Sequence, residues 1–343
     1  MVEGKPISIG NVAYVLGMDS KKLSRWYKHH LSGYREALAR GEIGRHDLHY
    51  KQKGVEWSVK VPILKPENLG SFMAIDEKSI NGRYYTILSN RETSRIALMA
   101  STLKVSELNE CMRKFPIRSR MNVKSITRDL APSFEWLART NFMNAYHVAD
   151  KFHIIREVLE QLQSHRIRHR QEILSLKRKP NRSVQENLIL HERCLNGDTL
   201  RQLLHRSRGL LYKREEEWTH EQAERAIELF TKYPDLKKTY KYCQMIRSWY
   251  APIRPRYSKK KFQTKRCRLE DIIEMGKESK VEEIINIACY LEKHKAEIMN
   301  YFYRRESNAK AEALNQNLQR FISINYGARE TDFFLYRVAK HFS

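Results

Sequence analysis

Apolar and polar positions near the N-terminus recur with helical spacing. Apolar residues fill most of 12–18, Gly17 would end that helix, and Asp19 or Ser20 could cap a second one, SKKLSRWYKHHL. A short helix, a turn and a basic amphipathic helix form a helix-turn-helix pattern. An ordinary two-helix packing unit gives the same pattern, so both interpretations stay open.

The pattern changes to strand periodicity after a segment rich in glycine and proline. Residues 41–70 are therefore expected to be a linker. Three short β-rich runs follow, FMAID, RYYTILS and SRIALMA, with SINGR and NRETS as turns. SELNECMRKF then predicts a helix, VKSITRDL a strand, PSFEWLART a helix, NAYHVAD a strand and FHIIREVLEQL a helix. Three antiparallel strands followed by this alternation predict a mixed α/β layer fold.

The C-terminal half has almost no strand signal. Long charged segments with a 3.6-residue period predict an all-helical block, and SNAKAEALNQNLQRFISIN predicts a further helix near the end. We therefore expect five regions: a helix-turn-helix region at 1–40, a linker at 41–70, an α/β core at 71–156, a helical insertion at 157–300, and the last part of the core at 301–343.

The charge balance indicates a polyanionic partner. Among 343 residues, 64 Lys and Arg stand against 40 Asp and Glu, a formal charge of +24. Hydrophobic residues make up 41%, which excludes general disorder, and for such a chain the commonest polyanion is nucleic acid. This net charge is larger than the solubility of a small domain requires.

Other composition features narrow the class of protein. No apolar run approaches the roughly 18 residues of a membrane span, and the start MVEGKPISIG lacks the apolar segment of a secretory signal. The five cysteines include no CxxC pair, so neither a zinc ribbon nor a disulfide framework is expected. We expect a cytoplasmic protein with reduced thiols.

Two basic segments are candidates for DNA contact. In the second N-terminal helix, Lys21, Lys22, Ser24, Arg25 and Lys28 would face a duplex while Leu23, Trp26 and Tyr27 pack inward. The segment RPRYSKKKFQTKRCR has no acidic residue to balance its cations, and it offers Lys259, Lys260, Lys261, Lys265 and Arg266. Another basic segment, SHRIRHRQEILSLKRKPNR, fits a solvated helix face better.

Three aspartates end predicted strands. Asp76 ends FMAID, Asp129 follows SITR, and Asp150 ends YHVAD. Carboxylates at one edge of an α/β sheet are the hard oxygen ligands that divalent cations prefer. Asp is also a frequent helix cap, and Asp150 would serve equally well as the cap of FHIIREVL.

Several segments resemble a known family. IDEKSINGRYYTILSN, ITRDLAPSF, VADKFHIIREV and SNAKAEALNQNLQRFISINYGARETDFFLYRV look like the DDE transposases of bacterial insertion sequences, of the ISL-three family. The similarity runs from about residue 70 to the C-terminus. It implies a ribonuclease-H-like fold with a helical domain inserted before the helix that carries the third carboxylate.

The resemblance also implies a site. Its catalytic, metal-binding residues would be Asp76, Asp129 and Glu312, holding two Mg²⁺ ions, with Mn²⁺ as an alternative. Asp150 and His153 resemble an Asp-x-x-His signature and would support the site or position DNA; a cap and a buried histidine are the alternative. Asn315, three residues after Glu312, would contact the terminal DNA strand, with solvent exposure as its alternative.

The implied activity is metal-dependent cleavage at the terminal inverted repeats of an insertion sequence and strand transfer into target DNA. Transposases of this kind act as oligomers on DNA, in bacteria and at the nucleoid. Many members carry a cysteine-rich zinc module ahead of the helix-turn-helix, which this chain lacks, so a companion protein for end recognition stays open. A non-catalytic DNA-binding regulator, or a decayed transposase, is the second hypothesis, and a nuclease for branched DNA is the third.

Overall fold

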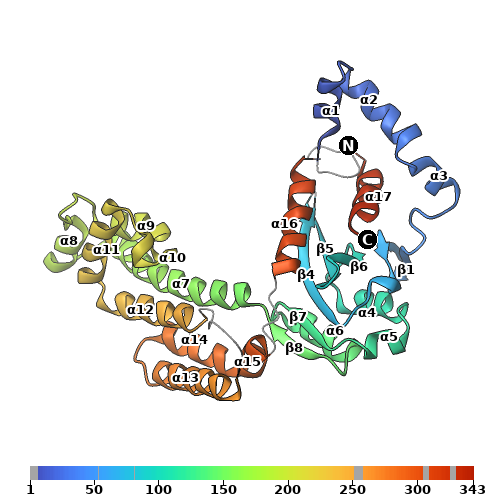
Figure 1. Cartoon of the computed structure of the whole chain (residues 1–343). Helices are drawn as coiled ribbons and strands as arrows, with labels where there is room; N and C mark the ends of the chain where they lie inside the picture. Colours follow the sequence, from blue (N-terminus) through green and yellow to red (C-terminus); the bar gives the residue numbers. More distant parts are fainter. Residues whose placement is uncertain (1–6, 53, 81, 251–257, 304–308, 325–329) are drawn as a thin grey trace. The chain divides into compact units, whose positions relative to one another are not determined.

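The chain forms two compact units (Figure 1). The first comprises Met1–Asp150 and Glu306–Ser343, and the second comprises Lys151–Arg305. The computed structural model describes residues 7–52, 54–80, 82–250, 258–303, 309–324 and 330–343. The second unit interrupts the first in sequence, so the first unit is built from both ends of the chain.

A six-stranded mixed sheet forms the centre of the first unit. Its order is β3-β6-β5-β4-β7-β8, antiparallel from β3 to β4 and parallel from β4 to β8. The bounds are Ile63–Leu64 (β3), Phe72–Ile80 (β4), Arg83–Asn90 (β5), Arg95–Ala100 (β6), Ser125–Arg128 (β7) and Tyr146–Ala149 (β8). The predicted mixed α/β sheet is confirmed.

Helices cover both faces of this sheet. Met73 and Ile75 of β4 share one core cluster with the buried side of α4 (Val105–Arg113) and α6 (Pro132–Asn141). Ile80 and the β5 residue Ile87 share another cluster with α16 (Ala309–Ile324) and α17 (Thr331–Phe342). Alternate side chains of a strand point to opposite faces. Position 76 of β4 therefore belongs to the face that α16 and α17 cover.

The segment predicted to be a linker contains β structure. A two-stranded antiparallel hairpin joins β1 (Leu48–Gln52) to β2 (Val55–Val59), and β3 adds an edge strand to the main sheet. Gly54, which has a φ of +81°, supplies the backbone conformation that the hairpin turn requires. The hairpin was missed because most side chains of β2 are exposed, which leaves little apolar signal.

The predicted N-terminal helix pair is present. It consists of α1 (Ile9–Val15) and α2 (Ser20–Trp26), continued by a π-helical turn, η1 (Tyr27–Leu31), and by α3 (Tyr34–Ala39). Gly17 adopts a φ of +61° after α1, and the Asp19 carboxylate accepts the Lys22 N–H at 2.7 Å, which caps α2 as expected. Tyr27 and Tyr34 pack edge-on against Phe333 of α17.

The remaining short elements of the first unit are α5 (Ile117–Met121) and the 3₁₀ turn η2 (Pro66–Asn68). The second unit is helical in its described part. Its elements are α7 (Lys151–Arg178), α8 (Val184–His191), α9 (Leu200–Arg206), α10 (Arg208–Tyr212), η3 (Glu215–Glu217), α11 (His220–Lys232), α12 (Pro234–Trp249), α13 (Lys259–Lys277), α14 (Glu282–Lys293) and α15 (Lys295–Tyr303).

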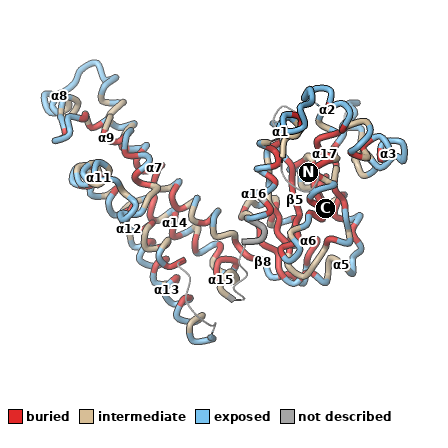
Figure 2. Tube along the Cα trace, turned by 45° about the horizontal axis from the view of Figure 1, so that its top comes forward, coloured by how far each residue is buried: buried red, intermediate tan, exposed pale blue. Residues whose placement is uncertain are grey.

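The long helix α7 is the central packing element of the second unit. Ile154, Val158 and Leu162 repeat at i, i+4 and i+8 and are completely buried. Figure 2 shows buried and exposed segments following one another along α7. Helices α9, α12 and α14 pack along α7. Among the described residues, no helix is both long and apolar enough to span a membrane.

Candidate active site

Asp76 and Asp129 lie side by side where the parallel pairing of β4 with β7 ends. Asp76 was expected to end its strand, but β4 continues to Ile80 because its antiparallel pairing with β5 extends that far. The parallel pairing of β4 and β7 ends with Ile75 opposite Arg128, and each aspartate is the next residue of its chain segment. Neighbouring strands lie about 4.8 Å apart. Strand pairing therefore brings together two carboxylates that lie 53 positions apart in the sequence.

The Asp76 carboxylate has a backbone N–H and a lysine ammonium beside it. Its Oδ1 accepts the Glu77 backbone N–H at 2.8 Å, and Lys78 Nζ lies 3.7 Å from Oδ2. The Asp76 side chain is 22% exposed. It is thus partly open to solvent, as a cation-binding carboxylate needs to be.

Asp150 continues the same row of residues. The β7–β8 pairing ends with Arg128 opposite Ala149, and the Asp150 N–H donates to the Arg128 carbonyl at 3.2 Å. Asp150 is thus two strand spacings from Asp76, about 9–10 Å. His153 lies in the first turn of α7, in the other compact unit.

The third predicted carboxylate is on α16. Leu314, Leu318 and Phe321 of this helix are buried against the sheet face to which Asp76 belongs. Glu312 and Asn315 are helical positions of α16, and their side chains lie outside the described residues. The fold therefore brings the helix of Glu312 onto the same face of the sheet as Asp76.

The predicted DNA-facing residues of the N-terminal helices fall into two groups. Lys21, Lys22 and Arg25 are exposed. Lys28 instead forms an ion pair with Glu330 next to α17, and its ammonium lies 5.7 Å from the centre of the Tyr34 ring. The prediction for Lys28 is therefore corrected: its ammonium contacts the protein, because η1 turns this position toward α17.

The tryptophans Trp26, Trp136 and Trp249 differ in how far they are buried. Trp26 was expected to pack inward with Leu23 and Tyr27, which are buried, but it is 49% exposed. Trp136 of α6 is also 49% exposed, whereas Trp249 is buried.

The basic residues at the start of α13 also differ in exposure. Lys259 and Lys260 are exposed, Lys261 is partly buried, and Arg266 Nε lies 3.2 Å from the Glu270 carboxylate. Lys265 is only 8% exposed, donates to the Trp249 carbonyl, and lies about 5 Å from the ring centres of Trp249 and Phe302. The prediction that Lys265 contacts DNA is corrected, because this side chain is buried within the helical unit.

The basic segment on α7 was expected to be a solvated helix face, but part of it is buried among the helices of the second unit. Arg166 is buried and donates to the Leu204 carbonyl at 2.9 Å. Arg168 makes two hydrogen bonds to Glu283, at 2.8 and 3.0 Å. These cations connect helices of the second unit to one another.

A family comparison decides the class of this protein. The model of the ISL-three type DDE family, described as transposase, matches residues 73–338. The chain belongs to this transposase family. The match includes Asp76, Asp129 and Glu312, and begins after the N-terminal helices. No curated protein matches the chain.

Membership gives this transposase a general role in DNA transposition by insertion sequences, and DNA as its substrate. Enzymes of the family typically need a divalent metal. The donors at the sheet edge fit such an ion, because the Asp76 and Asp129 side chains offer hard carboxylate oxygens at adjacent strand positions.

Sequence reasoning missed Arg128. Its side chain is completely buried, its Nη1 donates to the Asp129 carbonyl at 3.1 Å, and its Nη2 lies 3.7 Å from the Glu135 carboxylate. Arg128 therefore fixes the backbone at Asp129. A charged residue inside the four-residue strand SITR was the available signal.

Proposed function

We propose that this transposase cuts DNA at the ends of an insertion sequence and joins the freed 3′ ends to target DNA. Asp76, Asp129 and Glu312 are the proposed catalytic and metal-binding residues. The adjacent register positions of Asp76 and Asp129, on the sheet face that α16 covers, carry this proposal. The same arrangement supports a ribonuclease-H-like core interrupted by a helical insertion.

The chemistry is two successive in-line displacements at phosphorus. In the first, water attacks the phosphodiester, the bond to the 3′ oxygen breaks, and a 3′ hydroxyl is released. In the second, the oxygen of that hydroxyl attacks a target phosphodiester, the bond from the target phosphorus to its 3′ oxygen breaks, and the target strand is left with a free 3′ hydroxyl. Two bound divalent cations, Mg²⁺ or Mn²⁺, would supply activation of the attacking oxygen and stabilisation of the leaving oxygen.

The contribution of the chain is position and charge. Carboxylates on two neighbouring strands give a rigid pair of ligands, because the sheet ladder fixes their separation. Arg128 holds the backbone of Asp129 in place. Exposed Lys21, Lys22 and Arg25 are proposed to contact duplex phosphates from a helix-turn-helix, and Lys259, Lys260, Lys261 and Arg266 to contact phosphates from the helical unit.

Other roles remain proposals that accompany this one. Asn315 is proposed to contact the terminal strand, and Asp150 with His153 to position DNA rather than bind the catalytic ions. Pairing of two element ends requires a homo-oligomer on DNA. A companion protein would assist end recognition if the N-terminal helices are insufficient.

A nicking assay tests the proposal. Full-length protein is incubated with a labelled DNA fragment that carries the inverted repeats flanking its gene, with and without Mg²⁺. We expect Mg²⁺-dependent nicking by the wild type, none by Glu312→Gln, and normal nicking by Glu110→Gln. Glu110 is the matched control because it is exposed and pairs only with Arg113 of its own helix in the described structure.

The alternative hypothesis, a non-catalytic regulator or a decayed transposase, predicts a different result. The wild type would then bind the fragment and leave it intact at every metal concentration. Nicking that is undiminished in Glu312→Gln would also reject the proposed site.

A further inference from the structure

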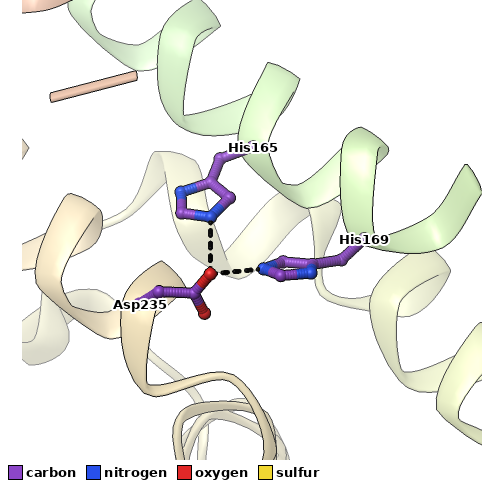
Figure 3. A group of neighbouring side chains, drawn as sticks. All are labelled: His165, His169 and Asp235. Atoms are coloured by element: carbon purple, nitrogen blue, oxygen red, sulfur yellow. Dashed lines mark hydrogen bonds and ion pairs between the residues drawn. The ribbon is translucent and has the colours of Figure 1, made fainter. Parts of the chain in front are cut away.

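A second cluster of potential ligands lies within the helical unit. His165 and His169, one turn apart on α7, both direct Nε2 at Oδ2 of Asp235, which is in the first turn of α12 (Figure 3). The two distances are 3.1 and 2.9 Å. The three ligand atoms lie within 4.8 Å of one another.

The other ring nitrogens also have partners. His169 Nδ1 lies 3.0 Å from the Glu172 carboxylate, and His165 Nδ1 lies 2.8 Å from the Thr239 hydroxyl and 3.6 Å from Glu283. A neutral imidazole has one N–H, so in its neutral form His169 could donate to only one of its two carboxylates. If a cation takes both Nε2 lone pairs, each Nδ1–H points at an acceptor. Metal-bound histidines almost always show this arrangement.

Spacing and charge agree with an ion at this place. Ligands about 2.0–2.1 Å from a tetrahedral zinc ion are separated from one another by roughly 3.3 Å, close to the Nε2–Oδ2 distances found here. Three carboxylates, those of Asp235, Glu172 and Glu283, contact the two imidazoles, and one cation, Arg168, pairs with Glu283 at 2.8 Å and lies 3.6 Å from Glu172. A divalent ion would offset the two remaining negative charges.

The site is open on one side. The His165 side chain is fully buried, whereas that of Asp235 is 39% exposed. Three protein ligands with one solvent-facing direction leave a fourth position for water. Two imidazoles and one carboxylate suit zinc, whereas the carboxylate set at the sheet edge suits magnesium.

We propose that His165, His169 and Asp235 form a zinc site that fastens the N-terminal end of α12 to α7. It is separate from the proposed catalytic carboxylates, because its residues all belong to the second compact unit. Its role is to stabilise the helical unit, with Glu172 and Thr239 orienting the two imidazoles. This inference does not depend on the proposed function.

The test uses metal-stripped full-length protein and two probes. Co²⁺ is titrated while visible absorption is recorded, since a tetrahedral site gives intense bands, and Zn²⁺ is then added in competition. We expect one Co²⁺ per chain to give these bands, Zn²⁺ to displace it, and Zn²⁺ to raise the thermal midpoint by several degrees.

Four variants assign the signal. Asp235→Asn keeps the size of the side chain and should weaken binding at least 100-fold; Glu172→Ala should weaken it about 10–100-fold by releasing His169. Two controls should retain wild-type affinity: His220→Gln, whose imidazole is 89% exposed, and Asp76→Asn, which removes a proposed catalytic ligand. Circular dichroism verifies folding, and Glu172→Ala decides the question if Asp235→Asn does not fold.

Two results would overturn the proposal. Absence of tetrahedral Co²⁺ bands in the wild type would mean that the cluster is a histidine–carboxylate ion network without a metal. Bands that persist in both Asp235→Asn and Glu172→Ala would place the bound ion elsewhere in the chain.

Discussion

Asp76 and Asp129 follow directly after a pair of residues that face each other across two parallel strands. Asp150 continues this row but is one strand further away. Asp76 and Asp129 are therefore close enough to share an ion, whereas Asp150 is too far from Asp76 to share one with it. The next prediction uses this difference.

Replacing Asp76, Asp129 or Asp150 by asparagine should lower the rate of nicking to different extents. Asp76→Asn and Asp129→Asn should each lower the rate of Mg²⁺-dependent nicking by roughly 10³-fold or more, because a lost ligand removes several kcal/mol of transition-state stabilisation. Asp150→Asn should keep measurable nicking. Single-turnover cleavage of an end fragment checks this, with DNA affinity measured alongside. Equal losses in all three variants would contradict the assignment of Asp150.

Exposed and internally paired lysines should differ in their effect on DNA binding. Replacing Lys21, Lys22 and Arg25 together by Gln should reduce the slope of log affinity against log salt by about 2–3, since each phosphate contact contributes about 0.9. Lys28→Gln should leave that slope unchanged and lower stability instead, because Lys28 pairs with Glu330. Filter binding across a salt series, with thermal melts of each variant, measures both effects. An unchanged slope in the triple variant would remove these helices from the interface.

Two glycines of the helical unit should respond oppositely to alanine. At Gly276 a Cβ would lie 2.6 Å from the Ala288 Cβ and would overlap the Tyr242 hydroxyl, so Gly276→Ala should destabilise by about 1–3 kcal/mol. At Gly209, apart from its chain neighbours and its own helix backbone, no atom of the described residues lies within 4 Å of the place that a Cβ would take, so Gly209→Ala should be neutral or stabilise by up to about 1 kcal/mol. Urea unfolding compares the pair. Equal effects would show that α13 does not pack this closely on α12 and α14.

Lys265 should make stability depend on alkaline pH. Burial lowers the pKa of this lysine from its ordinary value to about 8. Between that value and the unfolded pKa the unfolded chain binds more protons, so stability rises with pH over this range. From about pH 7.5 to about pH 10 the wild type should gain roughly 1–3 kcal/mol relative to Lys265→Met. Denaturant unfolding at both values tests this, and parallel pH profiles would contradict it.

Local patterns predicted much of the secondary structure. Alternation in FMAID and RYYTILS and 3.6-residue spacing in α7 arise from the backbone geometry of single elements, so the chain order of strands and helices could be inferred. The β1–β2 hairpin was missed, because most side chains of β2 lie in solvent and leave no apolar period.

Placement of individual side chains was less predictable. Lys265 has exposed basic neighbours in sequence, and nothing local indicates that Trp249 and Phe302 will enclose it. The spacing of His165 and His169 was visible in SHRIRHR, but their common partner Asp235 lies 66 positions beyond His169. Such contacts depend on which helices pack together.

The sequence by itself determined the family, the excess of positive charge, and the location of Asp129 and Asp150 directly after strands. Tertiary structure decided that β4 lies between β5 and β7, which brings Asp76 next to Asp129. It also decided which lysines face solvent and that two histidines meet one aspartate. The physical reason is that periodicity records how each element divides into a buried and an exposed side, whereas strand order and helix packing depend on contacts between residues distant in the chain.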